Sequence, residues 1–332
     1  MTPLPAFSLK LRTRIWAELL SCLLKFQPYN KTQQINQEVA MTHTASTLMP
    51  FFGLIRVSGE DRASFLHNQL SNDINHLSAG QACLATYNTA KGRVIANIVV
   101  LKRDEDIILI AAADLCETLQ KKLQIYIMRS KVKLQSMDEW GVAVSIPAIT
   151  TVQAEPVPQY VLSATQINQI WQITLPDNTT IQIGKINQLP PLNTETAKAW
   201  QVQQINSGIP WISAATTETC VAQMLNQQLI GAVHFKKGCY PGQEIIARAQ
   251  YRGQVKRGLA LLETTAILTA GDTITDSNNE EVGLIINQVQ QETATLALAV
   301  IKHSAAETQL QCNNHPLTIK KCFFTTVITG NT

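Results

Sequence analysis

From Gln254 to the C-terminus, short apolar segments alternate with polar turns. Short strands at such spacing are typical of a compact antiparallel barrel. We therefore expect a C-terminal β-barrel over residues 251–332. The expected strands cover residues 256–263, 273–275, 282–289, 293–301 and 316–327.

The segment upstream of this tail mixes hairpins with single helices. Residues 82–87 and 93–102 have strand composition, and the residues between them have hairpin chemistry. A further apolar segment at 107–113 predicts another strand. Apolar residues spaced at four then predict a helix. They are Leu115, Leu119, Leu123 and Ile127. This mixture indicates an α+β fold.

Residues 147–192 differ because prolines punctuate them. Short strands are expected at 167–175 and 180–184. A helix over 194–206 should end near Gly208, since glycine often terminates helices. We expect one α+β domain of two subdomains over residues 45–250, with residues 150–192 in the second.

Composition indicates a globular protein: 45% of the 332 residues are hydrophobic and 15% are charged. The net charge of +3 is too small to indicate a nucleic-acid-binding protein by itself. No apolar segment reaches the length of a membrane span. Residues 1–44 contain cations and an apolar segment that Glu18 interrupts. We expect this extension to be poorly ordered, with a membrane-surface helix as the alternative.

The seven cysteines are dispersed, and no two are closer than ten residues. This spacing excludes the short C-x-x-C pairs of zinc and many iron–sulfur sites. The odd number does not indicate a disulfide framework, and a reducing cytoplasm fits best. We therefore predict no metal ion or iron–sulfur cluster held by this chain itself. His67 and His76 lack partners at metal-binding spacing and are interpreted as surface or loop residues.

Cys239 lies in an unusual local sequence, between Gly238 and Gly242 and behind Lys236 and Lys237. Glycine and proline at this density predict a tight turn. Nearby cations stabilise a thiolate and lower the pKa of its thiol. A turn cysteine without any role remains the alternative. The cations that follow are Arg248, Arg252, Lys256 and Arg257.

The segment from His234 to Gly253, which contains KKGCYPGQE, resembles the signature of the YgfZ family. These are folate-binding proteins related to the aminomethyltransferase of the glycine cleavage system. The resemblance runs from about Leu48 to the C-terminus. Weaker matches in the same order support it at residues 54–61, 65–66, 87–93, 130–132 and 206–210. It implies two α/β subdomains and a C-terminal barrel around a channel that holds tetrahydrofolate.

Two family tryptophans that contact folate fall at Trp200 and at about Phe52. Phenylalanine keeps a stacking face but lacks the indole N–H donor. Core packing is the alternative role for both residues. Arg252 and Tyr240 are predicted as further folate contacts. A cation suits the carboxylates of the folate tail, and an aromatic ring can stack on the flat pterin.

The related aminomethyltransferases carry a catalytic aspartate on the strand after the glycine turn. In this sequence Asn97 stands at the matching position. Asparagine cannot ionise, so it can neither act as a base nor stabilise an iminium charge. We therefore do not expect classical aminomethyltransferase activity, and enzymatic activity of any kind stays open.

The resemblance implies a folate-binding accessory protein for iron–sulfur cluster assembly or repair. It would support radical enzymes that modify tRNA. The protein would be cytoplasmic and would not associate with a membrane. Cys239 would be the reactive thiol, assisted by Lys237, Glu244 and Arg248. The remaining motif residues are Gly238, Gly242, Gln243 and Gly253.

Two alternatives belong to other classes. One is a tetrahydrofolate-dependent one-carbon transferase, against which Asn97 argues. The other is a module that contacts tRNA directly through the cations of residues 236–257, which should then bind with strong salt dependence. The small net charge makes this the least favoured function.

Overall fold

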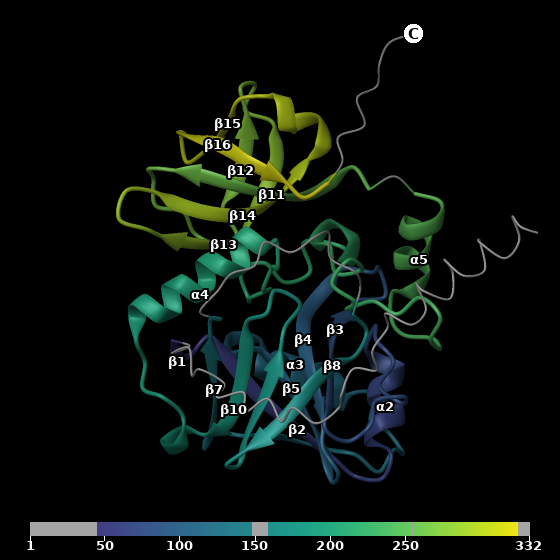
Figure 1. The fold of residues 1–332 in the computed structure, drawn as a ribbon. Coiled ribbons are helices and arrows are strands. Elements are labelled where there is room, and N and C mark those ends of the chain that lie inside the picture. The colour runs from purple at the N-terminus through teal and green to yellow at the C-terminus, as the bar shows by residue number, and fades with distance from the viewer. Residues whose placement is uncertain (1–44, 148–158, 254, 325–332) are drawn as a thin grey trace, which may run out of the picture. The chain divides into compact units, whose positions relative to one another are not determined.

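The computed structural model describes residues 45–147, 159–253 and 255–324 (Figure 1). Ten strands upstream of residue 250 form one sheet in which every pairing is antiparallel. In spatial order they are β1 (Ser46–Leu48), β7 (Trp140–Ser145), β10 (Thr180–Lys185), β9 (Ile170–Thr174), β8 (Leu162–Ile167), β3 (Gln81–Asn88), β4 (Val94–Lys102), β5 (Asp106–Ala112), β2 (Phe52–Ser58) and β6 (Lys133–Ser136).

This sheet consists of two halves that meet where β3 pairs with β8 over only two residue pairs. The sheet ends at β1 and β6, which have three and four residues. Together with its helices, it confirms the α+β class. The domain boundaries expected at 45 and 250 stay predictions, and the extension expected over residues 1–44 lies outside the described residues.

Four α-helices accompany the strands in the described ranges. They are α2 (Arg62–Gln69), α3 (Ala113–Gln124), α4 (Thr194–Ser207) and α5 (Gln243–Tyr251). The helix expected at 194–206 is confirmed as α4. Its N-terminal cap is Asn193, whose side chain accepts a hydrogen bond from the Thr196 N–H at 2.9 Å, and its C-terminal cap is Gly208 with a φ of +68°. These are the terminal residues that helices favour.

The central strands are apolar on both faces, because both faces of the sheet are covered. On β4, Ile98 and Val100 belong to one hydrophobic cluster, which also holds Leu66 of α2. Their neighbours Val99 and Leu101 belong to a second cluster. Side chains alternate between the faces of a strand, so a continuous apolar run is expected where neither face meets water.

The predicted barrel is confirmed as a closed, antiparallel ring of six strands. On β11, Leu259 and Leu261 join the large cluster that also contains residues of the ten-stranded sheet, whereas Ala260 and Leu262 fill the barrel interior. The strands in spatial order are β11 (Arg257–Thr264), β14 (Thr295–Lys302), β13 (Glu281–Gln290), β12 (Thr273–Asp276), β15 (Leu310–Cys312) and β16 (His315–Cys322).

One strand prediction was wrong. The segment 167–175 is not a single strand, because Asn168 and Gln169 adopt positive φ angles of 49° and 68°. These two residues form the turn between β8 and β9. Two consecutive residues with positive φ are typical of tight hairpin turns, which usually contain glycine. The absence of glycine at this turn explains why the sequence pattern concealed it.

Candidate functional site

The Cys239 side chain is exposed on a loop that leads into α5. The tight turn predicted for this segment lies at residues 240–243, where the Gln243 N–H donates to the Tyr240 oxygen at 3.2 Å. The five other cysteines in the described residues are buried or partly buried. Cys239 is therefore the described thiol most accessible to another molecule.

Lys237 fastens this loop to the end of α2. Its side chain is buried, and its Nζ donates hydrogen bonds to the main-chain oxygens of His67 and Leu70. Lysine near a helix C-terminus satisfies carbonyls that lack helical partners. Burial lowers the pKa of Lys237 to about 8, against the attraction of Asp73 and Cys239. Nζ also lies 4.8 Å from the centroid of the Tyr240 ring.

His67 lies on α2 and packs against the same loop, contrary to its interpretation as a surface or loop residue. Its side chain is only 12% exposed, and Nδ1 lies 3.2 Å from Oδ1 of Asp73 without making a well-directed hydrogen bond. A Cβ atom added to Gly238 would lie 3.3 Å from Nε2 of His67. Burial, and then the charge of Lys237, lower the pKa of His67. His76, in contrast, is 87% exposed.

Gly242 ends the loop against the β3–β4 hairpin. Its φ is +79°, and an added Cβ would lie 2.5 Å from the main-chain oxygen of Thr89 and 2.6 Å from Cα of Gly92. Only glycine combines this backbone angle with such a close approach. The two glycines at positions 92 and 242 therefore let the hairpin and the cysteine loop meet backbone to backbone.

The remaining predicted motif residues lie on or beside α5. Gln243 is its first residue. Glu244 and Arg248 form an exposed ion pair at 3.0 Å, which contributes little to stability. Arg252 and Gly253 follow the helix and are exposed. Tyr240 is buried, and burial raises the pKa of its hydroxyl group.

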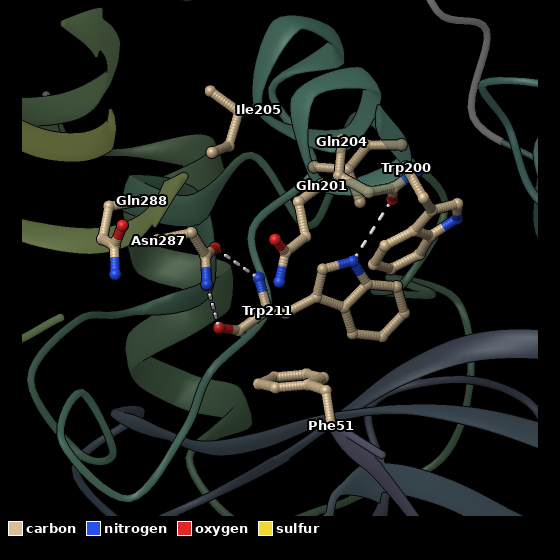
Figure 2. A pocket seen from close by; sticks show the side chains of 9 residues that line it. Phe51, Trp200, Gln201, Gln204, Ile205, Trp211, Asn287 and Gln288 are labelled. Carbon is tan, nitrogen blue, oxygen red and sulfur yellow. Dashed lines mark hydrogen bonds between the residues drawn. The ribbon is translucent and has the colours of Figure 1, made fainter. Parts of the chain in front are cut away.

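A second candidate site is a small aromatic pocket (Figure 2). Trp200 of α4 and Trp211 line it, with ring centroids 6.1 Å apart, and Phe51 closes another side. Phe52, which was predicted as a ligand contact, instead packs behind them. Its ring lies 4.8 Å from Trp211 and 5.7 Å from Trp200 in edge-to-face geometry.

All residues that line this pocket are neutral, and its cavity volume is about 50 Å³. Its polar wall consists of side-chain amides from Gln201, Gln204, Asn287 and Gln288. Such amides can donate and accept hydrogen bonds at the same site. The Trp200 indole N–H is buried without a hydrogen-bond partner.

A hydrogen-bonded chain connects the pocket to a carboxylate. The Trp211 indole donates to Oε1 of Gln204 at 3.2 Å, and Nε2 of Gln204 donates to Oδ2 of Asp177 at 2.5 Å. Burial raises the pKa of Asp177, although hydrogen bonds from Thr179 and Gln204 oppose this effect. Asp177 lies on the turn between β9 and β10.

Two asparagines hold the main chain at Trp211. Asn287 of β13 accepts from the Trp211 N–H and donates to the Trp211 oxygen, both at 2.8 Å. Asn97 of β4 donates to the Pro210 oxygen at 2.6 Å and accepts from the Ile212 N–H at 2.8 Å. Figure 2 shows the two bonds of Asn287.

The predicted site residues thus fall into two groups. Lys237, Gly238, Cys239 and the residues of α5 are contiguous, whereas Trp200 lines the aromatic pocket and Phe52 packs against its tryptophans without lining it. Neither Tyr240 nor Arg252 lines that pocket. Sequence reasoning missed His67, Trp211, Gln204, Asp177 and Asn287. Only Trp211 left a signal, because it directly follows the family-like segment that ends at Pro210.

Among residues 45–147, 159–253 and 255–324, no group of three or more metal-ligating side chains is arranged to hold a metal ion. Over the same ranges, no helix is both long enough and apolar enough to span a bilayer.

Known proteins resemble this chain in fold and in sequence. The structure of the glycine cleavage system aminomethyltransferase T from Bartonella henselae matches with a TM-score of 0.63 and covers 84% of this chain and 85% of that one. At 11% identity, the likeness concerns the fold alone. The protein therefore has the fold of glycine cleavage aminomethyltransferases.

Sequence relatives identify the family. The tRNA-modifying protein YgfZ of Colwellia psychrerythraea is 30% identical over 227 residues, which are 64% of this chain and 69% of that protein. Its namesake from Yersinia pestis (strain Pestoides F) is 27% identical over 287 residues, 80% of this chain and 87% of that protein. No family model matches. The chain belongs to the YgfZ family, as its cysteine signature indicated.

Proposed function

We propose that this protein binds a folate in the aromatic pocket and supports, through the Cys239 thiol, cytoplasmic iron–sulfur enzymes that modify tRNA. The observation that carries the folate part is the lining of the pocket. Two indoles and a phenyl ring face four side-chain amides, and no charged group intervenes. The relatives are named as tRNA-modifying proteins, which supports tRNA-modifying enzymes as the clients.

This lining suits the ring of a tetrahydrofolate. Aromatic side chains stack on flat heterocycles, and amides match ring atoms that alternate between donors and acceptors. A cavity of about 50 Å³ is smaller than a pterin, since ligand pockets usually span ~300–1,000 Å³. Binding therefore requires the pocket to widen, for which the flexible Gln201 and Gln288 side chains are suited. The folate carboxylates need cations outside this neutral lining, for which Arg252 stays a candidate.

Cys239 is proposed as the reactive group because it is exposed on a loop that buried contacts fix at both ends. Lys237 holds the loop on one side, and Gly242 meets the hairpin on the other. Lys237 lies two residues before Cys239 in the same loop, and its side chain is buried. Glu244 and Arg248 lie on α5, which follows this loop, and they form an ion pair in which each partly cancels the charge of the other.

The one-carbon transferase alternative is less favoured. Both amide atoms of Asn97 already bond to main-chain groups, at Pro210 and Ile212. In this arrangement Asn97 provides neither a base nor a negative charge for a reacting folate.

Calorimetric titration with tetrahydrofolate tests the folate proposal. The wild-type protein should bind, and Trp200→Ala should bind at least tenfold more weakly because it loses an aromatic wall. Trp171→Phe on β9 is the matched control, since Trp171 does not line the pocket, and it should bind normally. A wild-type protein that shows no binding would remove the folate assignment.

Complementation tests the thiol role. Cells that lack the protein should show reduced iron–sulfur-dependent tRNA modification, measured by nucleoside analysis, and the wild-type chain should restore it. Cys239→Ala should fail, while Cys322→Ala in the barrel should succeed. Full restoration by Cys239→Ala would leave Cys239 as a turn residue without this role.

A further inference from the structure

The main chain from Pro210 to Ile212 is hydrogen-bonded by side chains of two different structural parts. Asn287, from the barrel, pairs with the N–H and C=O of Trp211 itself. Asn97, from the ten-stranded sheet, pairs with the C=O before Trp211 and the N–H after it. In extended backbone these two sets of groups point to opposite sides. The two side-chain amides thus supply the hydrogen bonds that neighbouring strands would supply to an inner strand of a sheet.

A bulge in β13 determines on which face of the barrel the Asn287 side chain lies. The register of β13 shifts between Ile285 and Asn287, so that Asn287 lies opposite Leu298 of β14. Ile285 fills the barrel interior, whereas Leu298 belongs to the cluster shared with the ten-stranded sheet. Strict alternation from Ile285 would turn Asn287 inward. The extra residue instead places it on the outer face, and such bulges often re-aim a side chain near a functional site.

We propose that Asn97 and Asn287, which we call the clamp, are positioning residues for the ligand pocket. Together they hold Trp211 as a fixed wall opposite Trp200, so that ligand affinity depends on the correct seating of the barrel on the ten-stranded sheet. This inference rests on the proposed folate function. Neither asparagine needs to touch the ligand for this role, although the Asn287 side chain also lines the pocket.

Asparagine is the side chain that this role requires. Each amide donates one hydrogen bond and accepts another, which a carboxylate cannot do. Asn97 is 5% exposed, so a lost donor would leave the Pro210 oxygen buried and unsatisfied. Alanine at either position removes two main-chain hydrogen bonds and frees Trp211 to move.

The test compares Asn287→Ala and Asn97→Ala with Asn278→Ala, an exposed barrel position outside the clamp. Tetrahydrofolate affinity is measured by calorimetry, and the Trp211 indole N–H resonance is followed in ¹⁵N-labelled protein. Both clamp variants should bind about tenfold more weakly, and their Trp211 resonance should shift or broaden before ligand is added. The control should match the wild-type protein in both measurements.

The outcomes separate the two proposals. If the wild-type protein does not bind tetrahydrofolate, the folate function fails, and a changed Trp211 resonance in the clamp variants still supports the clamp. If the wild-type protein binds and Asn287→Ala keeps its affinity and its Trp211 resonance, the positioning role is overturned. Should Asn287→Ala not fold, Asn287→Asp, which keeps the acceptor for the Trp211 N–H but loses the donor for the Trp211 oxygen, takes its place in the same comparison.

Discussion

The ammonium group of Lys237 donates a hydrogen bond of 2.7 Å to the main-chain oxygen of Leu70, the residue that ends α2. A second bond reaches the oxygen of His67 in the last turn of the helix. Because an ammonium has three donors, at most one remains for another partner. Lys237 therefore acts first as an anchor of the Cys239 loop and only second as a charge beside the thiol.

We predict that Lys237 makes stability depend on pH above neutrality. Its pKa is lowered to about 8 in the folded protein from an ordinary value of 10.5. Between these values the unfolded chain binds more protons than the folded chain, so the free energy of unfolding should rise with pH. Below pH 8 this favourable contribution is absent.

Chemical denaturation of the wild-type protein and of Lys237→Met at pH 7, 8, 9 and 9.5 measures this effect. The difference in unfolding free energy, wild type minus variant, should increase across the series. A difference that stays constant or falls would show that Lys237 does not titrate as its burial implies. A titration midpoint near 8 for Lys237 Nζ in ¹⁵N-labelled protein would give the same result directly.

Gly242→Ala should destabilise the protein by about 3 kcal/mol or more, since backbone strain at positive φ costs ~1–3 kcal/mol and a steric clash adds to it. The added Cβ would meet the Thr89 oxygen at 2.5 Å. Gly80→Ala is a matched control, because Gly80 has a φ of +77° and an added Cβ would meet only the Ala164 oxygen, at an ordinary contact distance of 3.9 Å. Denaturant unfolding should show a cost of only about 1 kcal/mol for the control. Equal costs would contradict the close approach of loop and hairpin.

Among the described cysteines, Cys239 should react first with a water-soluble alkylating reagent. Cys83 and Cys220 are buried, and burial raises the pKa of both thiols. Burial also raises the pKa of Cys116 to about 11. Mass spectrometry after brief labelling of the folded protein should find the label at Cys239 well before these three. Cys239→Ser should abolish the fast phase, and a fast phase that persists would place the accessible thiol elsewhere.

Asn97→Asp should not create an aminomethyltransferase. The carboxylate cannot donate to the Pro210 oxygen, and it would be buried at a position where the side chain meets main-chain groups of Pro210 and Ile212. We expect a loss of about 3 kcal/mol in unfolding free energy and weaker folate binding. Asn178→Asp, on an exposed turn, should change stability little. Methylene transfer by Asn97→Asp with undiminished stability would contradict the clamp.

Much of the fold could be predicted from the sequence, because local patterns determine it. Short apolar segments separated by polar turns, such as the segment that contains Leu259 to Leu262, predicted the barrel strands. The helix that ends at Gly208 was predicted from that glycine. The turn at Asn168 and Gln169 was not predicted, since neither residue is the glycine that such turns usually contain.

The site was predictable only where its residues are adjacent in sequence. The cysteine loop is one continuous signature, so its position at an exposed turn followed from composition. The clamp is different, because Asn287 and Trp211 are 76 residues apart and a bulge decides where Asn287 points. A side chain that bonds to distant main chain leaves no periodic pattern in the sequence.

The ten-stranded sheet has its shortest members at its two ends, β1 and β6, with three and four residues. Exposed strand edges invite pairing with other polypeptides, and short edges offer few free main-chain groups for it. The barrel is a closed ring and has no such edge. In the described part of the chain, self-association by strand addition is therefore disfavoured at both sheets.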